Sequence, residues 1–264
     1  MTDRAGPAEG RALLRLQGIA LQFGGVKALQ GVSFEVASGS ICGLIGPNGA
    51  GKTSLFNCLS RLYDCQAGEI EFAGAPITRL PPHRIAPLGI GRTFQNLAMF
   101  RTLSVADNVR VGRHGRTSAG FFANALRLPV VGRERRETER RLAQVLDFLD
   151  LGRDAQTRVS ELPFGTQKRV ELARALVGEP RLLLLDEPAC GLNHEEVGRL
   201  GALIRRIRDE LRTTVLLVEH HMGLVMSVSD HVVALNFGKV LAAGTPQAVA
   251  NHPEVVAAYL GRAR

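Results

Sequence analysis

Most hydrophobic residues of this 264-residue chain lie in short apolar runs or in amphipathic stretches. Three nearly continuous apolar runs of strand length stand at residues 40–45, 182–185 and 214–218. Such runs are typical of strands buried on both faces of a parallel sheet. Three strand-like segments bounded by glycine or polar residues stand at residues 14–23, 32–36 and 68–74. They predict a small antiparallel layer beside the parallel sheet.

Helical spacing replaces the strand pattern from about residue 96 onward. Leu142, Val145, Leu146 and Leu149 recur at i, i+3, i+4 and i+7, which predicts a helical insert of about 65 residues. Another helix is expected over residues 166–177, because Gly178 and Pro180 form a stop signal. The tail from residue 241 contains a helix start at Thr245-Pro246 and a short helix near Tyr259.

Composition narrows the class of protein. A hydrophobic content of 45% and a charged content of 22% are those of a soluble globular protein. No apolar run approaches the roughly 18 residues needed to span a bilayer, and the polar start lacks a signal-peptide core, so export is not expected. The four cysteines show no C-x-x-C spacing, which favours reduced thiols over a zinc site or disulfides.

The net charge of +8 is concentrated in the middle of the chain. Residues 101–141 contain ten arginines and four acidic residues. A solvated helix face, a contact with anionic lipid and a contact with nucleic acid are three possible explanations. Nucleic acid is the least favoured, because no aromatic residues alternate with these arginines as they do in single-strand binders.

The strongest chemical signal is a phosphate-binding loop between the strand 40–45 and a helix predicted over residues 53–62. The loop fits G-x-x-x-x-G-K-[ST] with Gly46, Pro47, Asn48, Gly49, Ala50, Gly51, Lys52 and Thr53, and Ser54 follows it. Its glycines let successive N–H groups point inward, and the helix N-terminus favours negative charge. We expect Lys52 to reach the β- and γ-phosphates of ATP and the Thr53 hydroxyl to ligate Mg²⁺.

A pair of acidic residues ends the next apolar strand. Asp186 stands at the carboxyl end of residues 182–185, where α/β sheets bind their ligands. It is expected to hold Mg²⁺, and Glu187 to act as the general base for phosphoryl transfer. A strand-ending turn without chemistry is the alternative, which the phosphate loop disfavours.

These motifs together resemble the ATP-binding subunits of ABC transporters, over residues 14–261. Arg92-Thr93-Phe94-Gln95 is similar to that family's Q-loop, and residues 162–167 are similar to its signature. Gly191-Leu192-Asn193 is similar to its D-loop, and His220 stands at the position of its switch histidine. The resemblance implies that Gln95 contacts Mg²⁺ or the attacking water, and that His220 binds the γ-phosphate. It also implies that Phe23 stacks on adenine, whereas His221 is exposed and accessory.

The fold that the resemblance implies is a P-loop NTPase of the α/β class: a RecA-like parallel sheet, a small antiparallel β layer and an inserted helical subdomain. A flexible tail over residues 1–12 precedes one ATPase domain over residues 13–264. Within that domain, the nucleotide-binding core comprises residues 13–95 and 163–240. The helical subdomain is expected over residues 96–162 and a helical tail over residues 241–264.

The signature departs from the family's common L-S-G-G-Q form. It consists of Leu162, Pro163, Phe164, Gly165, Thr166 and Gln167. Proline has neither the hydroxyl nor the N–H of the usual serine. The free N–H groups of Phe164, Gly165 and Thr166 at the start of the following helix are expected to bind the partner's γ-phosphate instead. We therefore expect slower or weaker closure of the dimer.

The L-P-F-G-x-Q form, Glu187-Pro188-Ala189 and the closing Ala258-Tyr259-Leu260-Gly261 resemble the longer ATPase subunit of branched-chain amino acid importers. The same subfamily serves amides, urea and aromatic acids. The resemblance implies a head-to-tail dimer with a shorter paralogue or a second copy. It also implies two integral membrane permease subunits, a periplasmic solute-binding protein as an indirect partner, no nucleic acid, and a peripheral position on the cytoplasmic face of the inner membrane. A soluble ABC ATPase acting on ribosomes or nucleic acid, and a small-molecule kinase, are the alternatives.

Overall fold

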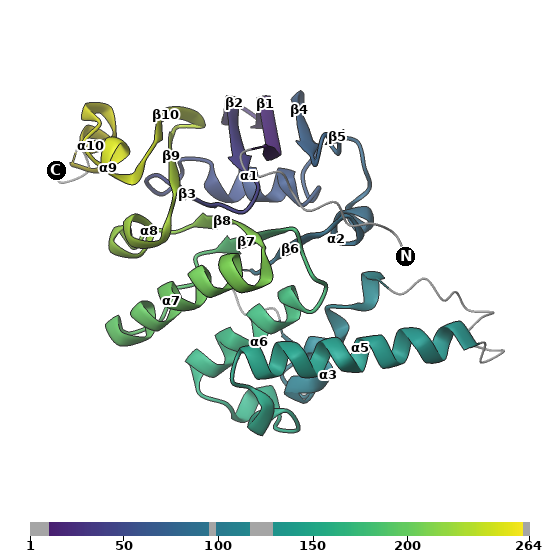
Figure 1. Cartoon of the computed structure of the whole chain (residues 1–264). Helices are drawn as coiled ribbons and strands as arrows, with labels where there is room; N and C mark the ends of the chain where they lie inside the picture. The colour runs from purple at the N-terminus through teal and green to yellow at the C-terminus, as the bar shows by residue number, and fades with distance from the viewer. Residues whose placement is uncertain (1–10, 95–98, 117–128, 261–264) are drawn as a thin grey trace. The chain divides into compact units, whose positions relative to one another are not determined.

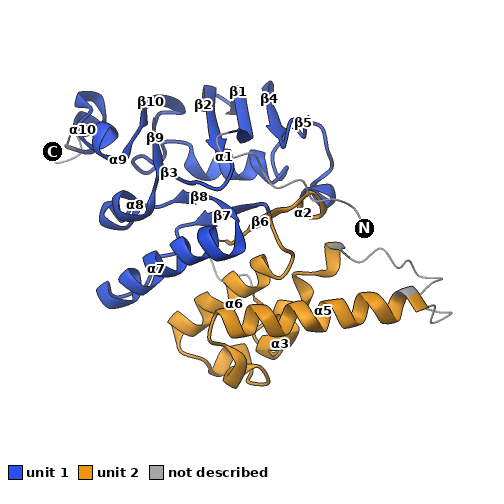
Figure 2. Ribbon diagram, in the orientation of Figure 1, with its two compact units in different colours: residues 1–85, 181–264 blue, residues 86–180 orange. Residues whose placement is uncertain are grey.

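The computed structural model describes residues 11–94, 99–116 and 129–260. The chain divides into two compact units, residues 1–85 with 181–264 and residues 86–180 (Figure 2). The chain passes from the first unit to the second within helix α2 (Ile85–Leu88). None of the helices in the described ranges combines the length and hydrophobicity required to cross a bilayer.

The first unit contains the predicted parallel sheet. Strand β3 (Ile41–Ile45) pairs in parallel with β8 (Thr214–Val218) and β9 (His231–Asn236), and β8 pairs in parallel with β7 (Leu182–Asp186). Every residue of β3, β7 and β8 is buried, as their continuous apolar sequences predict. Strand β10 (Lys239–Gly244) closes one edge by antiparallel pairing with β9.

Helices pack against this sheet. Helix α1 (Lys52–Leu59) contacts β7, while α7 (His194–Leu211) and α8 (Met222–Val228) contact β8 and β3, respectively. The short helices α9 (Pro246–Ala250) and α10 (Pro253–Leu260) contact β10. Because β10 pairs with β9 up to Gly244, the tail predicted as helical from residue 241 becomes helical only at Pro246.

The antiparallel layer is a separate sheet of order β2-β1-β4-β5 (Figure 1). It comprises β1 (Ala12–Phe23), β2 (Val26–Ala37), β4 (Ala67–Phe72) and β5 (Ala75–Pro76), with the 3-10 turn η1 (Pro82–Arg84) after it. The turn at Gly24-Gly25 joins β1 to β2 as expected. The tail predicted as flexible over residues 1–12 lies outside the described residues except for residue 11 and Ala12, which begins β1.

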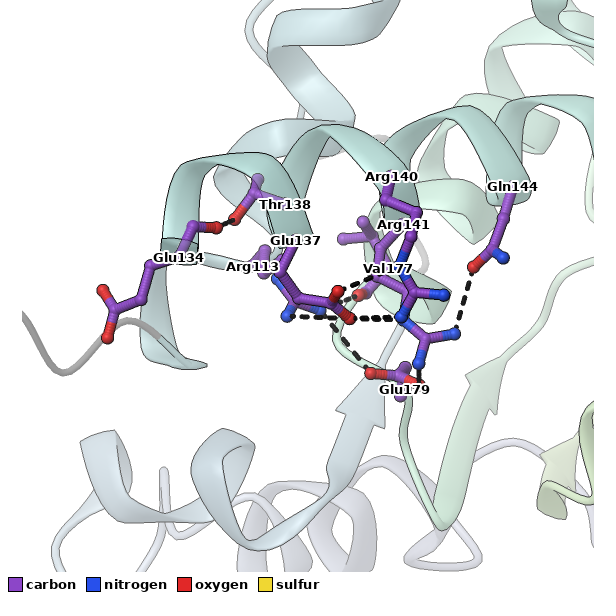
Figure 3. A network of polar contacts seen from close by, with 9 residues as sticks. All are labelled: Arg113, Glu134, Glu137, Thr138, Arg140, Arg141, Gln144, Val177 and Glu179. Carbon is purple, nitrogen blue, oxygen red and sulfur yellow. Dashed lines mark hydrogen bonds and ion pairs between the residues drawn. The ribbon is translucent and has the colours of Figure 1, made fainter. Parts of the chain in front are cut away.

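The second unit is mainly helical and extends further at both ends than the predicted 96–162. Its elements are β6 (Ile90–Arg92), α3 (Val105–Val111), η2 (His114–Arg116), α5 (Pro129–Phe148), η3 (Gly152–Asp154), η4 (Val159–Glu161) and α6 (Phe164–Leu176). Helix α6 packs on α3 and α5, which explains why residues up to Pro180 join this unit. The basic helix α5 is tied to the end of α6 by a polar network centred on Glu137, Arg141 and Glu179 (Figure 3).

Candidate functional site

The phosphate loop has a backbone that only glycine can adopt at two of its positions. Gly46 and Gly51 have φ values of 154° and 105°. A Cβ atom on Gly46 would lie 2.2 Å from the Leu235 carbonyl oxygen, and one on Gly51 would lie 2.6 Å from the Ala28 carbonyl oxygen. The loop therefore lies between the end of β9 and the start of β2. Its glycines are required by close backbone approach as well as by conformation.

Lys52 closes the loop on itself. Its ammonium donates to the carbonyl oxygens of Gly46 at 2.7 Å and Pro47 at 3.1 Å, and the residue is 6% exposed. A buried lysine is stable when its charge is paired or hydrogen-bonded, as here by two carbonyl groups. The loop tip at Asn48 and Gly49 is exposed, whereas Ala50 is buried. Lys52 is thus held at the loop, where an incoming phosphate can take over its hydrogen bonds.

The C-terminal helix α10 also reaches the phosphate loop, which the sequence did not predict. The Tyr259 hydroxyl is hydrogen-bonded to the Gly46 backbone. Burial raises the pKa of Tyr259, so the phenol stays neutral at physiological pH. The sequence signal was that residues 241–264 contain one Phe, Tyr or Trp residue, Tyr259.

Oxygen ligands suited to Mg²⁺ lie on the two elements expected to supply them. Thr53 is exposed and Ser54 half-buried in the first turn of α1, while Asp186 is 3% exposed at the carboxyl end of β7. Helix α1 contacts β7, so the two elements that carry these residues are neighbours in the first unit. Across the described ranges there is no cluster of three or more His, Cys, Asp or Glu side chains that could hold a metal alone. This donor set fits an Mg²⁺ that is bound partly by phosphate and water.

Glu187 and His220 lie together where β7 and β8 end. The Glu187 N–H donates to the Val218 carbonyl at 2.9 Å, and its Oε2 lies 3.9 Å from Nδ1 of His220. Glu187 has a φ of 46°, an uncommon conformation for a residue with a side chain. Its side chain is 17% exposed and that of His220 is 60% exposed. A carboxylate and an accessible imidazole thus lie at the same edge of the sheet as Asp186.

Glu219 organises this edge, although the sequence analysis gave it no role. Its buried carboxylate accepts hydrogen bonds from the N–H of Ala189 at 2.6 Å, of His220 at 3.0 Å and of His221 at 3.2 Å. It therefore joins the segment after Glu187 to the end of β8. The available signal was an acidic residue closing the apolar strand 214–218. His221 is exposed, and its Nδ1 accepts from the Leu224 N–H, capping α8.

Phe23 ends β1 with a ring that is 45% exposed. The ring of Tyr63, which is 37% exposed, packs edge-to-face against it with centroids 5.1 Å apart. Two half-exposed aromatic rings in contact offer more surface to a nucleobase than Phe23 alone. Phe23 was expected from the family resemblance, whereas no feature of the sequence indicated Tyr63.

The signature segment begins helix α6, with Pro163 as its N-cap and both Pro163 and Phe164 exposed. The expectation of three free N–H groups is wrong for Thr166, whose N–H donates to the Pro163 carbonyl at 3.0 Å. The first turn is a tight one, and this leaves the Phe164 and Gly165 N–H groups for an anion. Gln167 donates to the Leu162 carbonyl at 2.8 Å and holds the segment against the helix.

Gln95 lies outside the described residues, so its position relative to the other groups is not assigned. The residue before it is fixed: the Phe94 N–H donates to the buried Glu171 carboxylate of α6 at 2.9 Å. In the predicted D-loop, Gly191 has a φ of 81°. Asn193 caps α7 through a reciprocal capping box with Glu196. The predicted D-loop thus adopts the local structure that its residue types favour.

The sequence matches the ABC transporter family over residues 29–190 and the branched-chain amino acid ATP-binding cassette transporter family over residues 239–264. It is 42% identical over 253 residues to the high-affinity branched-chain amino acid transport ATP-binding protein BraF of Pseudomonas aeruginosa, covering 96% of this chain and 99% of BraF. It is 41% identical over 251 residues to LivG of Escherichia coli, a protein of the same description, covering 95% and 98% of the two chains. The descriptions of these relatives do not favour the alternative of an ATPase that acts on ribosomes or nucleic acid.

Solved structures agree with the fold. A nucleotide-free ATP-binding cassette from an ABC transporter superposes with a TM-score of 0.82 at 28% identity, covering 94% of this chain and 99% of that one. An ATP-binding cassette in its ADP conformation superposes with a TM-score of 0.83 at 28% identity, covering 96% and 100%. The expected P-loop NTPase core is therefore confirmed.

Proposed function

Because this chain belongs to the family of ABC transporter ATP-binding proteins, we propose that it is the ATP-hydrolysing subunit of an importer for branched-chain amino acids. The observation that carries the proposal is its similarity to BraF and LivG along nearly its whole length. Amides, urea and aromatic acids remain the other solutes to test, since related importers serve them.

In the proposed reaction, the phosphate loop would hold the ATP phosphates and Lys52 would exchange its two carbonyl partners for β- and γ-phosphate oxygens. Thr53 and Asp186 would hold Mg²⁺, which neutralises charge that develops on the transferred phosphoryl group. Glu187 would take the proton of the attacking water, and His220 would donate a hydrogen bond to the γ-phosphate. Gln95 would orient that water.

A second ATPase subunit would complete the site. We propose that Pro163, Phe164, Gly165, Thr166 and Gln167 of one subunit meet the ATP held by the other, in a head-to-tail dimer with a shorter paralogue or a second copy. The exposure of Pro163 and Phe164 at the start of α6 supports this role. ATP binding would then favour the closed dimer, and hydrolysis would restore the open one.

Two permease subunits would bind the helical unit at the cytoplasmic face of the inner membrane, and a periplasmic solute-binding protein would act indirectly through them. A cavity of about 360 Å³ in this unit supports the proposal. Phe94, Phe100 and Val111 are among its lining residues, and each is more than a third exposed. A short apolar helix of a permease fits such a surface.

The test is a pull-down from native membranes with Glu187→Gln as bait and Mg-ATP to retain the closed state. We expect two multi-span proteins and a shorter ATPase to elute together, and deletion of the gene to abolish uptake of labelled leucine. Lys52→Ala bait is the matched control, since it should not close with ATP. Recovery of ribosomes or nucleic acid without membrane proteins would contradict the importer, and loss of urea uptake with leucine uptake intact would change the solute.

A further inference from the structure

Two cysteine thiols lie next to one another behind the phosphate loop. Cys58 is buried in the last turn of α1, and Cys65 is half-buried in the loop that follows this helix. The two side chains share a hydrogen bond. Neither has a role in the proposed ATPase reaction. A buried thiol beside an accessible one is the arrangement found where cysteines are oxidised selectively.

The loop that carries Cys65 is folded back on the end of α1. The Arg61 N–H donates to the Cys58 carbonyl at 3.0 Å, and the Tyr63 N–H donates to the Asn57 carbonyl at 3.2 Å. The buried Arg61 guanidinium also donates to the Tyr63 carbonyl at 3.2 Å and to the Asp64 carboxylate at 2.5 Å. Backbone and side-chain bonds on the chain before Cys65 therefore hold the two thiols in proximity.

The surroundings give the two thiols different reactivity. The hydrogen bond with Cys58, together with the positive charge of Arg61, lowers the pKa of Cys65. The same hydrogen bond, reinforced by burial, raises the pKa of Cys58. Of the two thiols, Cys65 therefore ionises more readily and is the one that an oxidant can reach, whereas Cys58 is the buried thiol beside it.

We propose that Cys58 and Cys65 form a modification site that closes to a disulfide when a hydroperoxide reaches it. The Cys65 thiol loses its proton to solvent, and the thiolate attacks the outer peroxide oxygen. The O–O bond breaks, the sulfur becomes a sulfenic acid, and the other oxygen leaves as hydroxide or an alkoxide, which takes a proton from solvent to give water or an alcohol. Cys58 sulfur then attacks the Cys65 sulfur, the S–O bond breaks, and hydroxide leaves with the Cys58 proton as water. Two thiols are oxidised by two electrons and one peroxide is reduced.

The site connects the phosphate-loop helix to the aromatic pair at the end of β1. Beyond Cys65, the Gln66 N–H donates to the Ala20 carbonyl at 2.9 Å, and its side chain donates to the Gln22 carbonyl at 3.0 Å. Before Cys65, the Tyr63 ring packs on Phe23. A disulfide would fix this loop to α1 and shift Tyr63 relative to Phe23. Any effect of this shift on ATP binding rests on the proposed role of Phe23, whereas the thiol chemistry does not rest on it.

The test uses the full chain with Cys190→Ser, which removes the exposed competing thiol. The protein is titrated with hydrogen peroxide, alkylated after denaturation, digested and analysed by mass spectrometry. We expect a linked Cys58–Cys65 peptide that dithiothreitol releases. In Cys58→Ser, Cys65 should stop at the sulfenic acid and react with dimedone. Cys42, which is buried and whose pKa burial raises to about 12, should stay reduced throughout as the internal control.

Two results would overturn the proposal. One is oxidation of Cys65 to the sulfinic acid while Cys58 stays alkylatable, and the other is that both thiols survive peroxide doses that oxidise Cys190 in the parent chain. The first is read on the Cys190→Ser chain and the second on the parent chain, so neither depends on whether Cys58→Ser folds. Separately, the disulfide form should bind ATP about two- to tenfold more weakly, the range expected for one aromatic contact. Equal affinity of the two forms would contradict only the coupling to Phe23.

Discussion

At the residue scale, Glu219 joins the two strand ends that carry the proposed catalytic groups. Its carboxylate accepts three backbone N–H groups while wholly buried. In Glu219→Gln, the amide NH₂ would replace an acceptor oxygen and face an N–H donor. We expect the free energy of unfolding to fall by about 1–3 kcal/mol. The kcat for ATP hydrolysis should fall more than the affinity for ATP, because Glu187 and His220 lose their alignment while the phosphate loop is unchanged.

Urea denaturation and steady-state ATPase assays measure the two effects of Glu219→Gln. Glu195→Gln is the matched control, because that side chain is 81% exposed on α7 and bonds only to Arg199 in the described structure. If the Glu219 variant matched the Glu195 variant in both assays, Glu219 would not be a positioning residue.

Pro163 is a second residue-scale test, because it occupies the N-cap of α6, where serine is favoured. Pro163→Ser would restore a hydroxyl that can bind the γ-phosphate of the partner's ATP. A charge-assisted hydrogen bond is worth about 1.5–3 kcal/mol, so hydrolysis should accelerate by about ten- to a hundredfold. Pro163→Ala, which lacks the hydroxyl, is the control. Equal turnover of the Ser and Ala variants, measured by phosphate release, would show that the hydroxyl does not accelerate hydrolysis.

At the scale of the element, the polar network of Figure 3 gives helix α5 a pH-dependent contribution to stability. Hydrogen bonds from Arg140 and Arg141 lower the pKa of Glu137 from 4.5 to about 2. Because the folded-state pKa is the lower one, Glu137 stabilises the fold above about pH 4.5, and this contribution is lost as the pH falls toward about 2. Its side chain is 37% exposed, so we expect less than about 1 kcal/mol.

Urea denaturation between about pH 6 and pH 3 tests the contribution of Glu137 to the free energy of unfolding. Glu137→Gln should reduce the loss of stability on acidification relative to the parent chain, and high salt should weaken the effect. Glu195→Gln is again a control from an exposed helix pair. Parallel pH profiles of the parent and the Glu137 variant would show that Glu137 does not contribute to the pH dependence of the free energy of unfolding.

The same scale shows what the sequence determines and what it does not. Strands β7 and β8 have the predicted extents, because each is an unbroken apolar run between turn residues. Strand β2 is longer than the predicted 32–36, since half of its residues are exposed and pair with β1 across register shifts that disturb alternation. Helix α1 ends at Leu59 rather than at residue 62, because Arg61 turns the chain with a φ of 58°.

Some residues of the candidate site can be predicted from the sequence, whereas others are seen only in the structure. Lys52, Asp186 and Glu187 are predicted from local motifs, because their proposed chemistry depends on neighbours in sequence and on the end of a strand, and His220 is predicted from the family resemblance. The contacts of Glu219 with Ala189 and of Tyr259 with Gly46 join residues far apart in the chain. Only tertiary packing brings such groups together, so no local pattern predicts them.

At the scale of the whole molecule, this ABC-type ATPase carries both halves of the proposed composite site on one chain, a phosphate loop and a signature segment. Glu187→Gln should bind Mg-ATP without hydrolysing it. We therefore expect it to shift from monomer to dimer in gel filtration with light scattering, because a second copy can present Pro163 and Phe164 to the bound ATP. Chelation of Mg²⁺, or addition of Lys52→Ala to the variant, should restore the monomer, since each removes a positive charge that binds the ATP phosphates. A Glu187→Gln chain that stays monomeric in saturating Mg-ATP would contradict a dimer of identical subunits and would require the partner to be a different ATPase.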